Sequence, residues 1–260
     1  MQTRAQDGRV QSVDRALMLL EALGEHEEGY RLTDLARSTG LSPSTVHRLL
    51  TTLEQRRFVQ FDPSDNLWHV GRQAFRIGST FLRERNFAAP ALPFLRRLRD
   101  TTRETANLGI VDDGDIVVIK QMESREVRRT IARVGGRAPI LATGMGKAIL
   151  STYAAQDLTT VIGRQGLRKL TRNTLVERPA LEAQFGEIRN RGYAVDDEEC
   201  ALGVRCVASA VYDDRAEPLY AISISGSTQR LTHDRIPAIG RLVAETAREL
   251  TRSFGGRMPA

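Results

Sequence analysis

The segment 42–53 carries hydroxyl and basic side chains at a spacing that could bind a nucleic acid. Four of its apolar residues recur at i, i+3, i+4 and i+7, which predicts a helix that buries one face. The opposite face is rich in hydroxyls and has no acid before Glu54. Free N–H groups at the start of such a helix suit a phosphate, and side chains further along can reach base edges. The residues assigned to these contacts are Ser42, Ser44, Thr45, His47, Arg48 and Thr51.

Two shorter helices are predicted ahead of this segment. Apolar residues at helical spacing indicate a helix over 12–23, with Ser12 as its N-cap, and another over 33–39, with Thr33 as its N-cap. Gly40 ends the second of them, at a position that favours a left-handed residue. Two helices joined by a tight glycine turn are typical of a helix-turn-helix, whose second helix enters the major groove of DNA.

A short β-hairpin is predicted after these helices. Residues 56–61 alternate like a strand, 62–66 form a turn cluster and 67–70 resume an extended pattern. This hairpin would be the wing of a winged helix-turn-helix, with Asn66 and His69 near the minor groove or the DNA backbone. An ordinary helical hairpin followed by a β-hairpin is the alternative, but the order of the elements favours the winged helix.

Composition limits the class of protein. The 260 residues allow one large domain or two ordinary ones. No apolar stretch is long enough to span a membrane and Met1–Val10 is polar, which predicts a cytoplasmic protein. The net charge of +6 arises from 12 basic and 11 acidic residues over 1–86, and 26 and 21 over 87–260. Bulk charge therefore does not mark the N-terminal part as a nucleic-acid binder, and composition alone favours an arginine-rich protein with solvated faces.

The second half of the chain predicts an α+β domain, with helices on one side of an antiparallel sheet. Two prolines in 86–93 mark the domain junction, and the Asp-Gly pair in 112–115 predicts a hairpin. Helices are expected over 73–85, 91–104, 156–163, 178–191 and 234–254, with another that opens at 143–147. Strands are expected over 107–111, 116–119, 127–131, 206–212 and 219–225.

Several of these motifs resemble the isocitrate-lyase-regulator (IclR) family. The matching segments occur in order along nearly the whole chain and cover 10–17, 32–36, 40–50, 144–148, 191–193, 196–206 and 221–226. The resemblance implies a transcriptional regulator, a repressor by family habit, which pairs as a dimer or a dimer of dimers on operator DNA. It also implies a GAF-like second domain that binds small carboxylates or aromatic acids.

By this resemblance, the second domain holds a ligand site. Gly144 and Met145 open a helix whose free N–H groups could hold a carboxylate. Ser223 and Ser225 are two residues apart on a strand, so their hydroxyls face the same side. Taken singly, each residue has an ordinary explanation, such as a solvated strand face or a buried thiol, but their joint spacing matches glyoxylate- and pyruvate-sensing members. The effector set is Gly144, Met145, Asp196, Val204, Cys206, Ser223 and Ser225.

The expected ligand is a small 2-oxo acid, with a sugar acid or an aromatic acid as the alternative. No cofactor and no metal are expected, because the four histidines are dispersed and Cys200 and Cys206 lack a matching histidine cluster. The run 144–147 lacks the glycine and the hydroxyl that a P-loop needs at Leu141 and Ala148. A non-enzyme is therefore predicted; a GAF-like thiol enzyme is a remote alternative, and a metabolite-binding module without DNA contact is another.

These expectations define a domain plan and a set of partners. The predicted partners are double-stranded operator DNA, a small carboxylate effector and a second copy of the chain, and no membrane. The plan has a flexible tail over 1–10, a winged helix-turn-helix DNA-binding domain over 11–71, a linker helix over 72–90, a GAF-like effector-binding domain over 91–254 and a flexible tail over 255–260.

Overall fold

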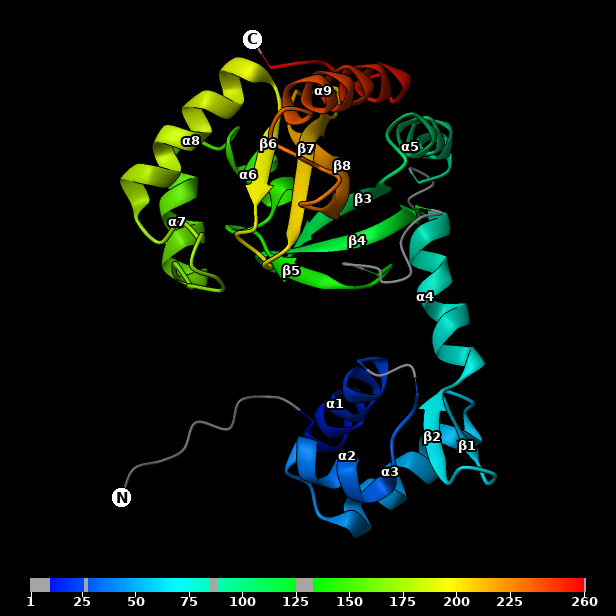
Figure 1. Ribbon diagram of the computed structural model, residues 1–260. Coiled ribbons are helices and arrows are strands. Elements are labelled where there is room, and N and C mark those ends of the chain that lie inside the picture. Colours follow the sequence, from blue (N-terminus) through cyan, green and yellow to red (C-terminus); the bar gives the residue numbers. More distant parts are fainter. Residues whose placement is uncertain (1–9, 26–27, 85–87, 125–132, 260) are drawn as a thin grey trace. The chain divides into compact units, whose positions relative to one another are not determined.

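The computed structural model describes residues 10–25, 28–84, 88–124 and 133–259, and the chain divides into two compact units (Figure 1). The first unit is Met1–Arg85 and the second is Asn86–Ala260. No helix in the described ranges is long and apolar enough to cross a membrane.

The first unit has the element order predicted for a winged helix-turn-helix. Its described elements are α1 (Gln11–Gly24), α2 (Leu32–Thr39), α3 (Pro43–Gln55), β1 (Val59–Asp62), β2 (Leu67–Val70) and α4 (Arg72–Glu84). The strands β1 and β2 pair as an antiparallel hairpin, and an isolated bridge between Tyr30 and Trp68 ties the segment before α2 to this hairpin.

One hydrophobic core holds these elements together. Leu19 of α1, Leu35 of α2 and Leu50 of α3 are fully buried and pack with Trp68 of β2. The turn between α2 and α3 is tight because Gly40 adopts a left-handed conformation, with φ 68°. The core therefore fixes α3 by one face and leaves its other face in solvent.

Two predicted helix caps are wrong. The N-cap of α1 is Val10, so Ser12 lies inside the helix, and the N-cap of α2 is Arg31, so Thr33 also lies inside. Neither Val10 nor Arg31 makes a side-chain cap bond. The first turns form without a hydroxyl cap because the apolar faces of both helices are buried, and such packing outweighs a cap bond of about 1 kcal/mol.

The second unit is the predicted α+β domain. Its helices within the described residues are α5 (Ala88–Thr102), α6 (Gly144–Leu150), α7 (Ala155–Gln165), α8 (Arg178–Arg191) and α9 (Ile236–Ser253). Its strands there are β3 (Thr105–Asp112), β4 (Asp115–Met122), β5 (Arg137–Pro139), β6 (Ala194–Asp197), β7 (Val204–Tyr212) and β8 (Pro218–Ser227).

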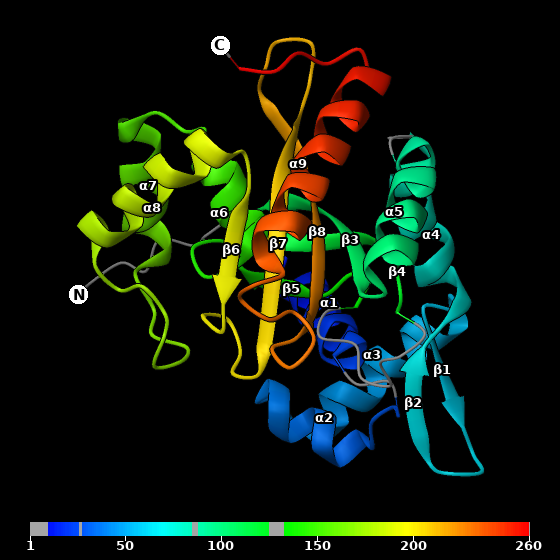
Figure 2. The same cartoon turned by 45° about the horizontal axis from the view of Figure 1, so that its top comes forward.

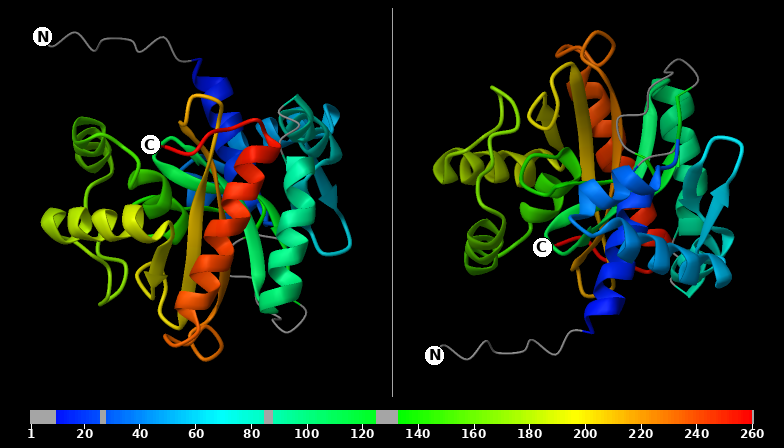
Figure 3. Two further views of the ribbon diagram at one scale, coloured as in Figure 1. Left: turned by 90° about the horizontal axis from the view of Figure 1, so that it is seen from above. Right: turned by 90° about the horizontal axis from the view of Figure 1, so that it is seen from below.

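The six strands form one antiparallel sheet in the order β5-β4-β3-β8-β7-β6. Helices α5 and α9 lie side by side on one face (Figures 2 and 3), where they pack on Leu108, Val207 and Ile222. Helices α6, α7 and α8 lie on the other face (Figure 2), where they pack on Val118 and Ala208. The sheet is thus covered on both faces, not on one side as predicted.

The structure corrects several element boundaries. Helix α5 begins at Ala88, so the part of 86–93 that is described is helical: Pro90 lies where a helix needs no N–H bond, and Pro93 lies inside the helix. The short edge strands β5 and β6 were not predicted, since four or fewer residues give no clear alternation. The predicted strand 127–131 lies outside the described residues.

Candidate nucleic-acid interface and small-molecule site

Helix α3 begins as the sequence predicts. The Ser42 Oγ accepts a hydrogen bond from the Thr45 backbone N at 3.3 Å, and Pro43 is the first helical residue. The Ser42 hydroxyl also lies 3.1 Å from the Ser44 Oγ and 2.9 Å from the Thr45 Oγ1. Three hydroxyls therefore gather where the helix has free N–H groups and no acidic residue, which suits an anionic group such as a phosphate.

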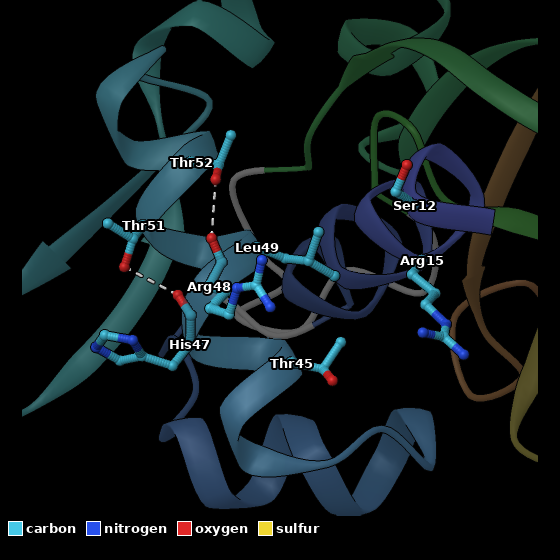
Figure 4. A pocket seen from close by; sticks show the side chains of 8 residues that line it. All are labelled: Ser12, Arg15, Thr45, His47, Arg48, Leu49, Thr51 and Thr52. Carbon is cyan, nitrogen blue, oxygen red and sulfur yellow. Dashed lines mark hydrogen bonds between the residues drawn. The ribbon is translucent and has the colours of Figure 1, made fainter. Parts of the chain in front are cut away.

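The middle of α3 presents its polar face to solvent. His47 and Arg48 are exposed, whereas Val46 and Leu50 on the opposite face are buried. The Thr51 Oγ1 donates to the His47 carbonyl O at 2.9 Å, as Figure 4 shows, so its oxygen lone pairs remain directed outward. In the described part of the chain, no carboxylate forms an ion pair with Arg48. Its guanidinium is thus available for a partner outside the protein.

Two open grooves flank this face of α3. One, of about 550 Å³, lies between α3 and α1 and is lined by Thr45, His47, Arg48 and Thr51 together with Ser12, Arg15, Leu49 and Thr52 (Figure 4). The other, of about 570 Å³, lies between α3 and the β1–β2 hairpin, where Asn66 joins His47 and Thr51. The structure therefore brings these four α3 residues and Asn66 to two grooves that share His47 and Thr51 in their lining, with Ser42 and Ser44 at the helix start.

Sequence reasoning missed basic residues beside these grooves. Arg15 lines the first groove from α1, and Arg31 lines the second from the segment before α2. Ser12, predicted as a cap, also lines the first groove. A helical projection of 11–24 would have placed Ser12 and Arg15 together, because they are three residues apart.

The candidate small-molecule site lies on the face of the sheet that α6 covers. The strand register pairs Asp196 of β6 with Cys206 of β7, and Cys206 with Ser225 of β8. Ser223 is two residues along β8 from Ser225, and Val204 two residues along β7 from Cys206, so each points to the same face as its neighbour. Asp196, Cys206 and both serines are buried, whereas Val204 is half-buried at the start of its strand.

Helix α6 begins directly over this row. A Cβ added to Gly144 would lie 3.1 Å from the Cys206 Sγ, and the Met145 Sδ would lie 2.9 Å from a Cβ added to Gly109. The Thr143 Oγ1 caps the helix by accepting from the Gly146 N at 3.1 Å. The predicted effector set is thus one contiguous buried group, with Val204 at its edge.

Four further polar residues of this face were not predicted as site residues. Lys147 of α6 is fully buried; its Nζ donates to the Val195 carbonyl O at 2.6 Å and pairs with the Glu199 carboxylate. Asn107 of β3 and Gln121 of β4 hydrogen-bond to each other at 2.8 Å, and Asn107 contacts both serines. The sequence offered a signal for only one of these residues, because Lys147 interrupts the otherwise apolar run 144–150. The two amides lie far from the other residues along the chain.

Burial shifts the titration of the acidic groups in this site. It raises the pKa of Asp196 to about 6, although the Lys147 ammonium and the backbone N–H groups of Glu199 and Cys200 oppose that rise. Burial likewise raises the pKa of the Cys206 thiol to about 12 and that of Cys200 to about 11. Both thiols are therefore protonated at neutral pH, which disfavours a thiolate nucleophile.

The raised pKa of Asp196 predicts a pH-dependent stability. A carboxyl group with a folded-state pKa near 6 and an ordinary unfolded value of 3.8 binds more protons when folded, so stability falls as pH rises between these values. Asp196→Asn keeps an Oδ1 acceptor but removes the charge. We expect the free energy of unfolding of the variant, relative to that of the wild type, to rise by up to about 3 kcal/mol between pH 4 and pH 8, as measured by urea unfolding.

A neighbouring carboxyl group supplies the matched control. Burial tends to raise the pKa of Asp197, but hydrogen bonds with His233 and Arg205 outweigh it and hold the pKa below its ordinary value. Asp197 therefore stabilises the fold above its unfolded-state pKa and loses this effect as pH falls. Asp197→Asn should therefore have a lower free energy of unfolding than the wild type at pH 8, whereas Asp196→Asn should have a higher one. Parallel pH profiles for the two variants would contradict the assignment.

Comparisons with known proteins match this architecture. Residues 12–63 match the family model described as "IclR helix-turn-helix domain", and residues 79–252 match "Bacterial transcriptional regulator IclR C-terminal". The chain is 43% identical over 251 residues to the acetate operon repressor of Salmonella typhimurium and 41% identical to the transcriptional repressor IclR of Escherichia coli, covering 96% of this chain and 92% of each relative. The Thermotoga maritima IclR crystal structure superposes with a TM-score of 0.78 at 26% identity, covering 95% of this chain and all of that one.

Proposed function

This chain belongs to the IclR family of bacterial transcriptional regulators, and on that premise we propose that it represses transcription by binding operator DNA through α3. The exposed face of α3 carries the proposal, because it combines three hydroxyls at a helix start with two flanking grooves and with Arg48, which has no ion pair among the described residues. Both relatives named above are repressors. Ser42, Ser44 and Thr45 are assigned to phosphates, and His47, Arg48 and Thr51 to the major groove, with Asn66 on the wing.

A gel shift on the DNA that flanks the protein's own gene tests this function. We expect a specific complex that weakens steeply with salt, because neutralising phosphates releases bound counterions. The two half-sites should lie about one helical turn apart, or a multiple of it, because two recognition helices would act together in a dimer. Absence of any specific complex would favour a metabolite-binding module without DNA contact.

Arg48 is expected to carry part of the sequence preference. Its guanidinium can make a bidentate contact with guanine, so Arg48→Ala should lower the preference for operator over random DNA by about 1–3 kcal/mol. Fluorescence anisotropy on both duplexes measures this ratio. Arg164→Ala, which removes an exposed arginine of α7 in the second unit, is the matched control and should leave the ratio unchanged. An unchanged ratio in Arg48→Ala would remove Arg48 from base readout.

We further propose that a small 2-oxo carboxylate controls this DNA binding from the site under α6. The buried row of Asp196, Cys206 and the two serines, closed by the start of α6, supports a small polar ligand more than a large aromatic one. Adding glyoxylate or pyruvate to the gel shift should change the complex. Sugar acids and aromatic acids are the alternatives, and a response to one of them alone would replace the 2-oxo acid.

The serine pair allows a direct test of this site. The double variant Ser223→Ala, Ser225→Ala removes both hydroxyls, and we expect it to lose the thermal shift that pyruvate or glyoxylate induces in the wild type. A matched variant, Ser64→Ala, removes an exposed hydroxyl of the β1–β2 turn and should keep the shift. An undiminished shift in the double variant would place the ligand elsewhere.

The assembly and the domain plan are part of the same proposal. The plan had a linker helix over 72–90, but α4 ends at Glu84 and α5 begins at Ala88 within the second unit. A DNA-binding domain over 11–71, a linker that contains α4 and a GAF-like effector domain that begins with α5 would let two chains present two α3 helices to one operator, as a dimer or a dimer of dimers. The ligand would act by shifting the population of DNA-binding arrangements. The thiol-enzyme alternative is disfavoured by the high pKa values of both cysteines.

A further inference from the structure

A buried asparagine connects the two serines of the proposed effector site. Asn107 lies on β3, is 2% exposed and pairs with Ser223 in the strand register. Its Nδ2 donates to the Ser223 Oγ at 3.2 Å and to the Ser225 Oγ at 3.0 Å. On its other side, the Gln121 Nε2 donates to the Asn107 Oδ1 at 2.8 Å. Gln121 therefore holds the amide so that its oxygen faces β4 and its nitrogen faces the serines.

This arrangement sets the hydrogen-bond polarity of the serine pair. An asparagine amide has two N–H donors, and here each goes to one serine oxygen. Each serine is an acceptor toward Asn107, so its own O–H hydrogen must point elsewhere. Within the described residues neither hydroxyl donates to an oxygen, and the Ser223 O–H is hydrogen-bonded to the Cys206 sulfur, which is a weak acceptor. The Ser225 O–H is therefore available to a ligand on this face of β8, and the Ser223 O–H becomes available when a ligand oxygen replaces the weaker sulfur acceptor.

We propose that Asn107, held by Gln121, is a positioning residue that fixes both serine hydroxyls as donors and thereby makes the site select a carboxylate over a neutral compound of the same shape. The inference rests on the proposed effector site. A hydrogen bond to an ionised acceptor is stronger than one to a neutral acceptor, so two directed donors favour the anion. They also offset the nearby Asp196 carboxyl group, which lies in the same row and would repel an anion when ionised.

Two substitutions of nearly unchanged shape should reverse this polarity from different positions. In Asn107→Asp both side-chain oxygens accept, so the serine O–H groups turn toward residue 107 and their lone pairs face the ligand. In Gln121→Glu the new carboxylate accepts from the Asn107 amide, which turns its oxygen toward the serines with the same result. Asn190→Asp adds the same charge at an exposed position of α8 and is the matched control.

Calorimetric titration of the full-length protein at pH 8 with pyruvate and with pyruvamide tests the proposal. We expect pyruvate to bind about 30-fold more weakly to Asn107→Asp and to Gln121→Glu, while pyruvamide changes by less than about threefold. Asn190→Asp should bind both probes like the wild type.

The outcomes separate this inference from the proposed function. Equal losses for pyruvate and pyruvamide, or wild-type binding by both polarity variants, would overturn the role of Asn107 and leave the effector site intact. Wild-type binding of pyruvate by the serine double variant would overturn the effector site itself, and the Asn107 inference with it. If thermal denaturation shows that Asn107→Asp does not fold, the pyruvate affinity of Gln121→Glu tests the inference instead, because Gln121 acts on the serines through Asn107 and lies further from the ligand.

Discussion

Lys147→Met is expected to destabilise the protein by about 3–5 kcal/mol, because it leaves a buried carboxylate without its counter-charge. The Lys147 side chain is fully buried under α6, and its ammonium pairs with Glu199, which is only 4% exposed. The Glu199 Oε2 has no hydrogen-bond partner among the described residues, so the lysine is the main compensation for that charge. Methionine fills a similar volume but supplies no donor. Urea unfolding at pH 7.5 measures the loss.

The partner substitution distinguishes charge from packing. If the lost counter-charge is the cause, adding Glu199→Gln to Lys147→Met should recover at least half of the stability, since the buried carboxylate is then gone. Lys169→Met removes an exposed lysine from the loop after α7 and should stay within about 0.5 kcal/mol of the wild type. If Lys147→Met and Lys169→Met unfold at the same urea concentration, the ion pair does not stabilise this fold.

The local sequence pattern predicted the bounds of an element correctly where that element buries a wide face or ends in a distinctive turn. Helix α8 has the predicted bounds of 178–191, because its buried Leu181, Phe185 and Ile188 recur at helical spacing. The hairpin at 112–115 and the Ser42 cap of α3 were also predicted, since both depend on a few adjacent residues. The predicted N-caps Ser12 and Thr33 were wrong. Both residues match the sequence pattern of a helix cap, but the packing of the apolar faces starts each helix before the hydroxyl residue.

The residues of the candidate ligand site were combined across segments only through the family resemblance, whereas pattern alone relates residues within a single segment. The Ser223–Ser225 pair follows from the alternation of one strand, and Gly144 and Met145 from one helix start. Asn107 and Gln121 could not be found in this way, because only the strand order β4-β3-β8 places them beside the serines. The role of Lys147 could not be found for a related reason: the sequence only excluded a phosphate loop there, and its partner Glu199 follows β6, about fifty residues further along the chain.

Gly146→Ala should destabilise the protein by about 3 kcal/mol or more, because α6 lies against the backbone that precedes it. A Cβ at position 146 would lie 1.9 Å from the Ile140 carbonyl O and 2.6 Å from its carbonyl C. Backbone atoms cannot turn away as the end of a side chain can, so α6 must shift. Since a Cβ at Gly144 of the same helix would lie only 3.1 Å from the Cys206 Sγ, that shift should also weaken any ligand bound over β7 and β8.

Gly163→Ala is the matched substitution, because it makes the same chemical change in α7 where no atom lies within 4 Å of the new Cβ. An exposed helical glycine costs conformational entropy, so this variant should gain about 0.5–1 kcal/mol. The two alanines are therefore expected to move the unfolding midpoint in opposite directions in parallel thermal and urea denaturation. Shifts of the same sign and size would mean that α6 does not approach Ile140 as closely as the structure shows, and the helix start would then be free to move when a ligand binds.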